Sequence, residues 1–132
     1  MQIITNNPQV KEKISAPSLR VRFVDGEYRD VLEKAREVVV DDKVSLLTHP
    51  LSSSLKPNET FYKSIALTDK AKAAIDLESL EMMENAISVY DKFSAQEKRP
   101  DWNEATLRDF SLIDLDLIQH ALERMQIPPH FM

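Results

Sequence analysis

The pattern of hydrophobic and polar residues divides the chain into short strands and amphipathic helices. Residues 3–5 form a β-branched apolar run, and residues 19–24 alternate apolar and basic side chains, so each stretch predicts a strand. Residues 28–40 carry apolar side chains at helical spacing, which predicts a helix with one buried face. Residues 44–48 and 64–68 are short apolar runs, which we expect to form buried strands.

Three further helices are predicted from start signals and from periodicity. Asn7 and Pro8 are residue types typical of a helix start, so we expect a short helix over residues 8–14. Apolar residues at steps of three and four predict long helices over residues 76–96 and 107–125. On the last of these helices, the expected buried stripe consists of Phe110, Ile113, Leu117, Ala121 and Met125.

This order of elements predicts a single α/β domain over residues 1–132, with a small, mostly parallel four-stranded sheet flanked by helices and with two C-terminal helices. The helices could cover one face of the sheet or both. The last strand could run antiparallel, because a loop without a helix precedes it. In parallel sheets, ligands bind beyond the carboxyl ends of the strands. We therefore expect the residues that follow the first three strands, near Asn6, Asp25 and Thr48, to lie side by side at a ligand site.

Composition and charge narrow the chemistry that the protein can perform. The 132 residues include no cysteine and one glycine, which excludes disulfides, thiol nucleophiles and glycine-rich phosphate loops. The net charge of −5 disfavours nucleic acid as a partner. The chain has neither an apolar run that could span a bilayer nor a signal peptide, so we expect a cytoplasmic protein without membrane contact. The three histidines lack metal-ligand spacing, and we expect neither a metal nor another cofactor.

The segment between residues 49 and 63 carries the sharpest chemical signal. It is dense in hydroxyl and amide groups, and Lys56 and Lys63 add positive charge. Several donors around a compact cation suit a small anion, although the same residue types also fill ordinary surface loops. The candidate ligand-binding residues are Asn6, Asn7, Thr48, His49, Ser52, Ser53, Ser54, Lys56, Asn58, Tyr62 and Lys63.

Four stretches of the chain carry a resemblance to a known family: residues 4–8 (ITNNP), 46–52 (LLTHPLS), 56–60 (KPNET) and 62–65 (YKSI). They resemble the GrdX family, small proteins encoded beside the glycine, sarcosine and betaine reductase genes of amino-acid-fermenting bacteria. Ser53 and Phe61 stand where the family commonly has glycine and proline. The resemblance implies a cytoplasmic accessory role in the glycine reductase pathway. Such a protein would bind a small metabolite, such as glycine or acetyl phosphate, or assist a reductase component.

Other interpretations of the same residues stay open. An enzyme acting on an acyl or phosphoryl substrate would use His49 as a general base and a serine among residues 52–54 as the nucleophile. A protein-interaction module would use the 49–63 loop as its contact surface, and the apolar stripe of the helix over residues 76–96 could join two copies into a homodimer. Asp114 and Asp116 point in different directions on the last helix, so we interpret them as part of a solvated face.

Overall fold

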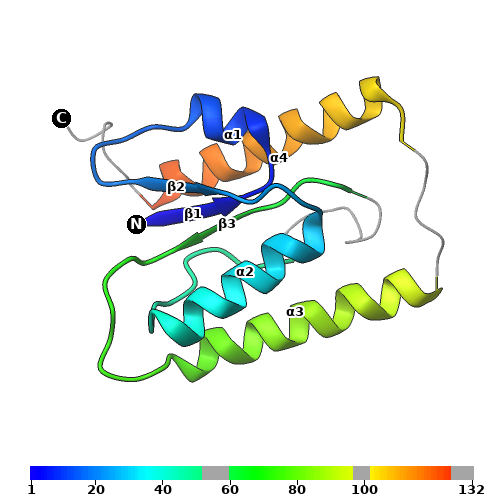
Figure 1. Cartoon of the computed structure of the whole chain (residues 1–132). Helices are drawn as coiled ribbons and strands as arrows, with labels where there is room; N and C mark the ends of the chain where they lie inside the picture. Colours follow the sequence, from blue (N-terminus) through cyan, green and yellow to red (C-terminus); the bar gives the residue numbers. More distant parts are fainter. Residues whose placement is uncertain (52–59, 97–101, 126–132) are drawn as a thin grey trace.

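The computed structural model describes residues 1–51, 60–96 and 102–125. Within them, every predicted helix and three of the four predicted strands are confirmed (Figure 1). The last helix begins three residues earlier than predicted, because Asn103 caps it by accepting a hydrogen bond from the backbone N–H of Thr106 at 2.8 Å. In chain order the elements are β1 (Gln2–Thr5), α1 (Pro8–Lys13), β2 (Arg20–Phe23), α2 (Tyr28–Asp41), β3 (Ser64–Leu67), α3 (Leu77–Gln96) and α4 (Glu104–Arg124).

The sheet is three-stranded and mixed, which corrects the prediction of a mostly parallel four-stranded sheet. Its strand order is β2-β1-β3. β1 pairs with β2 in parallel and with β3 in antiparallel orientation. The parallel pair follows from the α1 crossover between β1 and β2. The antiparallel run of β3 is the alternative that the sequence leaves open for a strand without a preceding helix.

Residues 44–48 lie along β3 but do not form the predicted strand. Their only bridge within the described part of the chain pairs Leu46 with Leu67. On both sides of this bridge, a side-chain oxygen accepts the hydrogen bond that a backbone carbonyl would accept in a sheet. Ala66 N donates to Thr48 Oγ1 at 3.0 Å, and Ser45 N donates to Thr68 Oγ1 at 2.9 Å. Because hydroxyl oxygens accept from these two backbone N–H groups, the backbone hydrogen bonds of a β-strand do not continue beyond the bridge.

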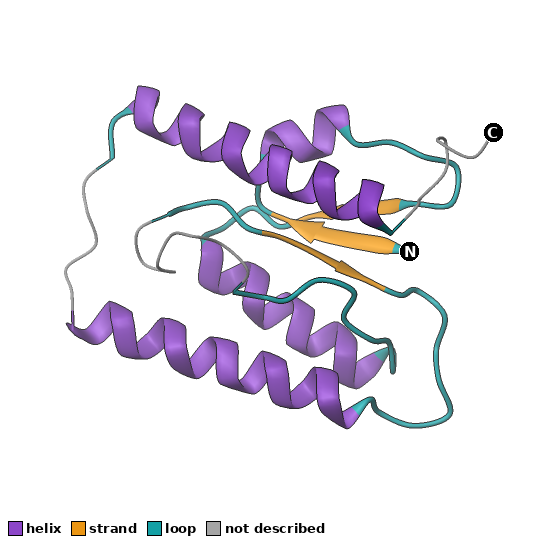
Figure 2. Ribbon diagram, turned by 180° about the vertical axis from the view of Figure 1, so that it is seen from behind, coloured by secondary structure: helices purple, strands orange, loops and turns teal. Residues whose placement is uncertain are grey.

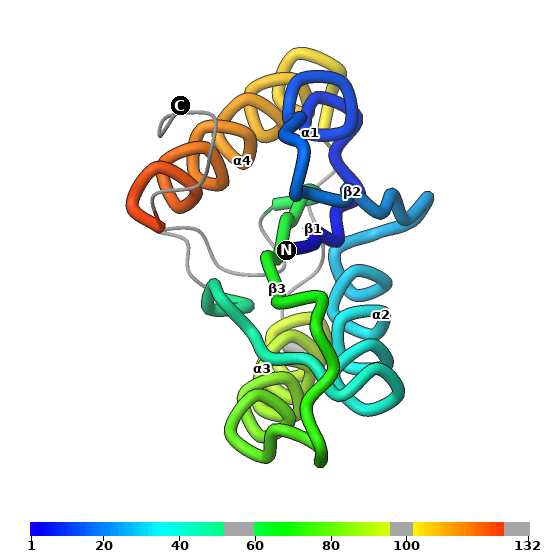
Figure 3. Tube along the Cα trace, turned by 90° about the vertical axis from the view of Figure 1, so that its left-hand side faces the viewer, coloured from blue at the N-terminus to red at the C-terminus, as the bar shows by residue number. Residues whose placement is uncertain are grey.

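The sheet lies between two pairs of helices. α1 and α4 cover one face and α2 and α3 lie on the other side, as the end-on view makes clear (Figure 3). The core between β1, β3, α1 and α4 is centred on Ile3, Val10, Ala66, Leu115 and Ile118. The core on the other face is larger, and Met83 and Ile87 of α3 are buried in it. The apolar stripe of α3 therefore packs inside the molecule. Seen from behind, α4 and α3 run along opposite sides of the sheet (Figure 2).

Two short polar motifs start the helices that follow β1 and β2. Asn7 Oδ1 accepts a hydrogen bond from Gln9 N at 3.0 Å, and Pro8 occupies the first turn of α1, as predicted. Glu27 and Asp30 form a capping box at the start of α2, with Glu27 N donating to Asp30 Oδ2 at 2.7 Å. No helix in the described ranges combines the length and the apolar character needed to cross a membrane.

Candidate functional site

A cavity of about 370 Å³ lies between α4, the start of β3 and residues 47–49. Three of the predicted ligand-binding residues, Thr48, His49 and Lys63, line it. The antiparallel alignment of residues 46–48 with β3 explains this meeting, because it brings the end of that segment to the beginning of β3. The complete lining is Leu47, Thr48, His49, Lys63, Ser64, Asp114, Leu117, Ile118, Ala121, Arg124 and Met125.

Lys63 contributes a buried ammonium group to the cavity wall. The residue is only 6% exposed, and its backbone N–H donates to Asn6 Oδ1 at 2.9 Å. Within the part of the chain that the structure describes, Lys63 Nζ has no hydrogen-bond or ion-pair partner. Burial lowers the pKa of Lys63 to about 8, while the charge of Asp114 acts in the opposite direction. Among the described side chains, the charge of Asp114 therefore compensates the ammonium only in part.

Asp114 projects from α4 into the same cavity, which corrects its interpretation as part of a solvated face. Its residue exposure is 7%, whereas the Asp116 side chain is 66% exposed. Asp114 Oδ2 accepts hydrogen bonds from Ser64 Oγ at 2.7 Å and from Asn7 Nδ2 at 3.0 Å. Burial raises the pKa of Asp114 even though these donors and Lys63 favour its ionised form.

A directed chain of hydrogen bonds holds the Asp114 carboxylate in place. Ser64 has one hydroxyl proton and donates it to Asp114, so Thr5 Oγ1 must donate to Ser64 Oγ across their 2.7 Å contact. Thr5 Oγ1 in turn accepts from Asn7 N at 2.9 Å. Every bond in this series points towards the carboxylate, which is the polarity that a negative charge favours.

His49 lies at the exposed rim of the cavity. Its Nδ1 accepts a hydrogen bond from the backbone N–H of Leu51 at 3.0 Å. In the neutral imidazole this bond places the proton on Nε2, so that atom carries a hydrogen rather than a basic lone pair. Thr48, next to it, is half-buried, and its hydroxyl oxygen accepts from Ala66 N.

Asn6 and Asn7 are buried, and their side chains are engaged inside the fold. Asn6 Nδ2 donates to Gly26 O at 3.1 Å and to Phe61 O at 2.9 Å. Asn6 therefore joins the ends of β1 and β2 to the residues that lead into β3. Asn7 caps α1 and also donates to Ser111 O and to Asp114. The structure thus gives both residues a positioning role, and direct contact with a ligand stays a prediction.

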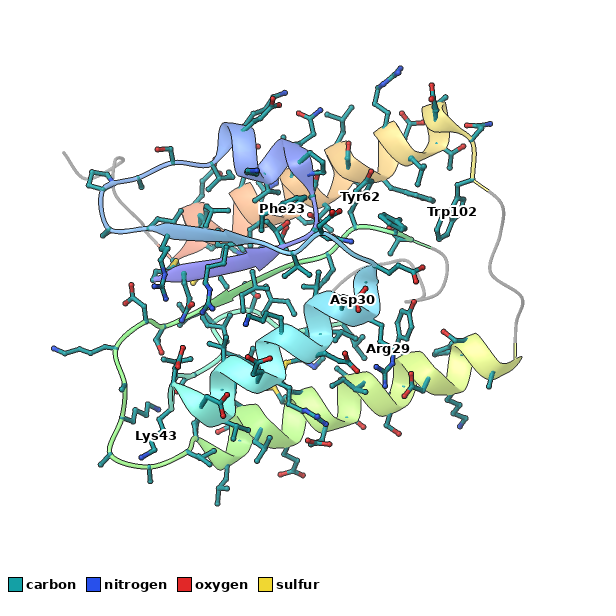
Figure 4. All side chains as sticks on the ribbon, in the orientation of Figure 1. Phe23, Arg29, Asp30, Lys43, Tyr62 and Trp102 are labelled. Carbon is teal, nitrogen blue, oxygen red and sulfur yellow. The ribbon has the colours of Figure 1, made fainter. Side chains whose placement is uncertain are left out.

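Tyr62 belongs to an aromatic cluster at the start of α4 rather than to the cavity lining. Phe61 packs edge-on against Tyr62, with ring centroids 5.1 Å apart, and against Trp102 at 6.4 Å. Trp102 in turn packs on Phe110. Tyr62 and Trp102 lie at the end of the molecule opposite Lys43 (Figure 4). This cluster fixes the backbone immediately before Lys63.

The remaining predicted site residues lie outside the described residues: Ser52, Ser53, Ser54, Lys56 and Asn58. Asp114 and Arg124 are the charged residues that the sequence analysis missed in the cavity lining. Among the residues with described positions, no cluster of three His, Asp or Glu could hold a metal ion.

Comparison with known proteins gives the family of the chain. No curated protein and no solved structure matches it. The family model described as "GrdX-like protein" matches residues 2–123, which include β1, the cavity-lining residues of β3 and nearly all of α4. Since this match covers almost the whole sequence, the chain belongs to the GrdX-like protein family.

Proposed function

We propose that the protein binds a small anionic metabolite in the cavity beside Lys63 and acts as a cytoplasmic accessory protein of the glycine reductase pathway. The observation that carries this proposal is the buried ammonium without a partner among the described residues. Removing such a charge from water costs several kcal/mol unless another charge or several hydrogen bonds compensate. A bound anion would supply that compensation.

The other groups around Lys63 suit a small carboxylate or phosphate. Arg124 adds a second positive charge to the lining, and Thr48 and His49 bring polar hydrogen atoms to the rim. The volume of about 370 Å³ lies at the lower end of the range of small-molecule sites, so it admits a metabolite of a few carbon atoms. Apolar side chains of α4, together with Leu47 and Met125, form most of the remaining wall.

The tautomer of His49 favours binding over general-base catalysis. A base at Nε2 needs its proton on Nδ1, but Nδ1 accepts the Leu51 N–H. His49 therefore fits better as a hydrogen-bond donor to an anion. The alternatives of an enzyme with His49 as its base and of a protein-interaction module stay predictions.

The family supports the pathway part of the proposal. The genes of GrdX-like proteins are expected beside reductase genes. A protein that binds a substrate or product of the reductase could hold or deliver that compound. Co-purification with a tagged reductase component, in the presence and absence of acetyl phosphate, tests this part separately from ligand binding.

Thermal unfolding tests the binding site itself. We expect acetate, phosphate or acetyl phosphate to raise the Tm of the wild type, because a ligand at 100 times its Kd adds about 2.7 kcal/mol to stability. Lys63→Met should abolish the rise, and Lys70→Met, which removes an exposed lysine, should keep it. Equal shifts in all three proteins, or no shift with any of the anions, would refute binding at Lys63.

A further inference from the structure

The cavity presents two opposite charges that are not paired with each other. Lys63 and Asp114 both line it, and both are more than nine-tenths buried. No ion pair joins them, although each is close enough to feel the charge of the other. They come from different elements, Lys63 from the residue before β3 and Asp114 from the middle of α4. The space between an ammonium and a carboxylate is thus part of one cavity.

The Asp114 carboxylate keeps the capacity to accept a further hydrogen bond. Its two side-chain hydrogen bonds arrive at Oδ2, from Ser64 and Asn7. The backbone of Ser64 also donates to the carboxylate and favours its ionised form. The chain of hydrogen bonds from Thr5 through Ser64 fixes the carboxyl group by Oδ2. An ionised carboxylate has about four lone-pair sites, so this one can still accept a hydrogen bond from a ligand.

Asp114 disfavours any anion in the cavity that does not also carry a positive charge. An anion near Lys63 would also lie near the Asp114 carboxylate, and repulsion between like charges is strong there because both residues are buried. A ligand that also carries a cationic nitrogen would pair with Asp114 and bring no net charge into the cavity. Burial raises the pKa of Asp114, and a bound cation would stabilise its ionised form.

We propose that the ligand of this cavity is a small aliphatic zwitterion, with its carboxylate at Lys63 and its ammonium at the Asp114 carboxylate. This inference rests on the proposed function, because it assumes that the Lys63 cavity binds an anion. Leu117, Ala121 and Met125 would contact the carbon chain between the two charged groups. Arg124 would add to the attraction at the carboxylate end.

Isothermal titration calorimetry with matched ligands tests the zwitterion proposal. Glycine, β-alanine and 4-aminobutyrate form a series of increasing charge separation, and propionate and propylamine each carry one of the two charges. We expect one member of the series to bind the wild type at least tenfold more tightly than propionate or propylamine. Asp114→Asn, which keeps the shape of the side chain, should reduce this preference over propionate to less than threefold. Asp116→Asn, on the exposed face of α4, should leave it unchanged.

The outcomes separate this proposal from the proposed function. Equal affinity of the wild type for propionate and for every zwitterion would overturn the zwitterion and leave the anion site standing. Binding of propylamine alone, or of none of the ligands, would overturn the zwitterion, and the anion site is then decided by thermal unfolding with acetate, phosphate and acetyl phosphate. A preference that survives in Asp114→Asn would also overturn the role of Asp114. The comparison of ligands on the wild type decides the question even if Asp114→Asn does not fold.

Discussion

Lys63 and Asp114 are both buried, but they differ in the number of groups that stabilise their charges. The carboxylate is held by two donors, whereas the ammonium has no partner in the described part of the chain. A buried charge without full compensation is costly to the folded state, and sites with such charges are often functional. Burial lowers the pKa of Lys63 and raises the pKa of Asp114, so it favours the neutral form of each side chain. Both shifts have consequences for stability that can be measured.

The stability of the protein should rise with pH above neutrality because of Lys63. Burial lowers its pKa from 10.5 to about 8. Between these values the unfolded chain still binds a proton that the folded chain has lost, so the free energy of unfolding increases as the pH rises. At 1.36 kcal/mol per pKa unit the increase is about 3 kcal/mol. Urea unfolding at a series of pH values should show it in the wild type and not in Lys63→Met, and parallel curves would contradict the burial of this ammonium.

Sequence reasoning predicts Lys63 in the cavity lining and misses its other two charged residues, Asp114 and Arg124. Thr48, His49 and Lys63 were predicted from their local density of polar groups, and all three line the cavity. Asp114 was missed because the apolar stripe of α4 was assigned to a face that includes Ile113 and Leu117, which are 46% and 43% exposed. The buried face consists of Ser111, Asp114, Leu115 and Ile118, at the same helical spacing. Because Ser111 and Asp114 are polar, a search for apolar residues does not identify this face as the buried one.

At the scale of the elements, Asn7 links α1 to α4. Its Oδ1 caps α1, and its Nδ2 donates to Ser111 O at 2.8 Å and to Asp114. One amide group thus satisfies a helix start, a helix carbonyl and a buried carboxylate. Aspartate caps helices as well as asparagine does, but it has no N–H to donate. The chain therefore requires the amide at this position for a tertiary reason.

Asn7→Asp should destabilise the protein far more than the matched change at the start of α4. It would place a second carboxylate beside Asp114, and we expect a loss of about 3 kcal/mol at neutral pH. The loss should shrink as the pH falls, because one of the two carboxyl groups then takes up a proton. Asn103→Asp changes an exposed cap and should alter the free energy of unfolding by less than about 0.5 kcal/mol. Equal effects of the two variants in urea unfolding would refute the link between α1 and α4.

The single glycine supports the start of α2 through the space that it leaves free. A Cβ atom at Gly26 would lie 2.5 Å from Asp30 Oδ2, the atom that accepts the Glu27 N–H. Gly26→Ala should therefore displace Asp30 and cost about 1 kcal/mol, the usual value of a helix cap. Asp30→Ala should cost a similar amount, and the double variant should cost little more than either. Additive losses in thermal unfolding would show that Gly26 acts independently of the cap.

Hydrophobic periodicity predicted the helices well and the sheet less well. The long stripes in α2, α3 and α4 extend over several turns, so they identify each helix without tertiary information. Residues 44–48 have the composition of a strand, but Thr48 and Thr68 replace backbone partners with hydroxyl groups. Such substitutions depend on the register between distant segments. Local sequence therefore could not show that residues 44–48 form a single bridge instead of a β-strand.

Across the whole molecule, the cavity lies beside the sheet on the side that α4 covers. β1, β3 and α4 bring together residues that are far apart in the chain, as the contact of Asn7 with Asp114 shows. The cavity lining comes from both halves of the chain, and the family match over residues 2–123 includes all of it except Arg124 and Met125. The α/β class and the family were predictable from sequence, and so was the presence of Thr48, His49 and Lys63 near one another. The mixed sheet and the opposite charges in one cavity required the structure.

Binding of an anion at the Lys63 ammonium is the central claim, and NMR of the lysine side chains tests it most directly. The ¹³Cε signal of Lys63, assigned by its absence in Lys63→Met, reports the protonation of Nζ. Without ligand we expect it to titrate near pH 8. With saturating acetate or 4-aminobutyrate the pKa should rise, because a bound carboxylate stabilises the ammonium. A Lys63 signal that titrates like those of the exposed lysines, or that none of the anions moves, would contradict the claim.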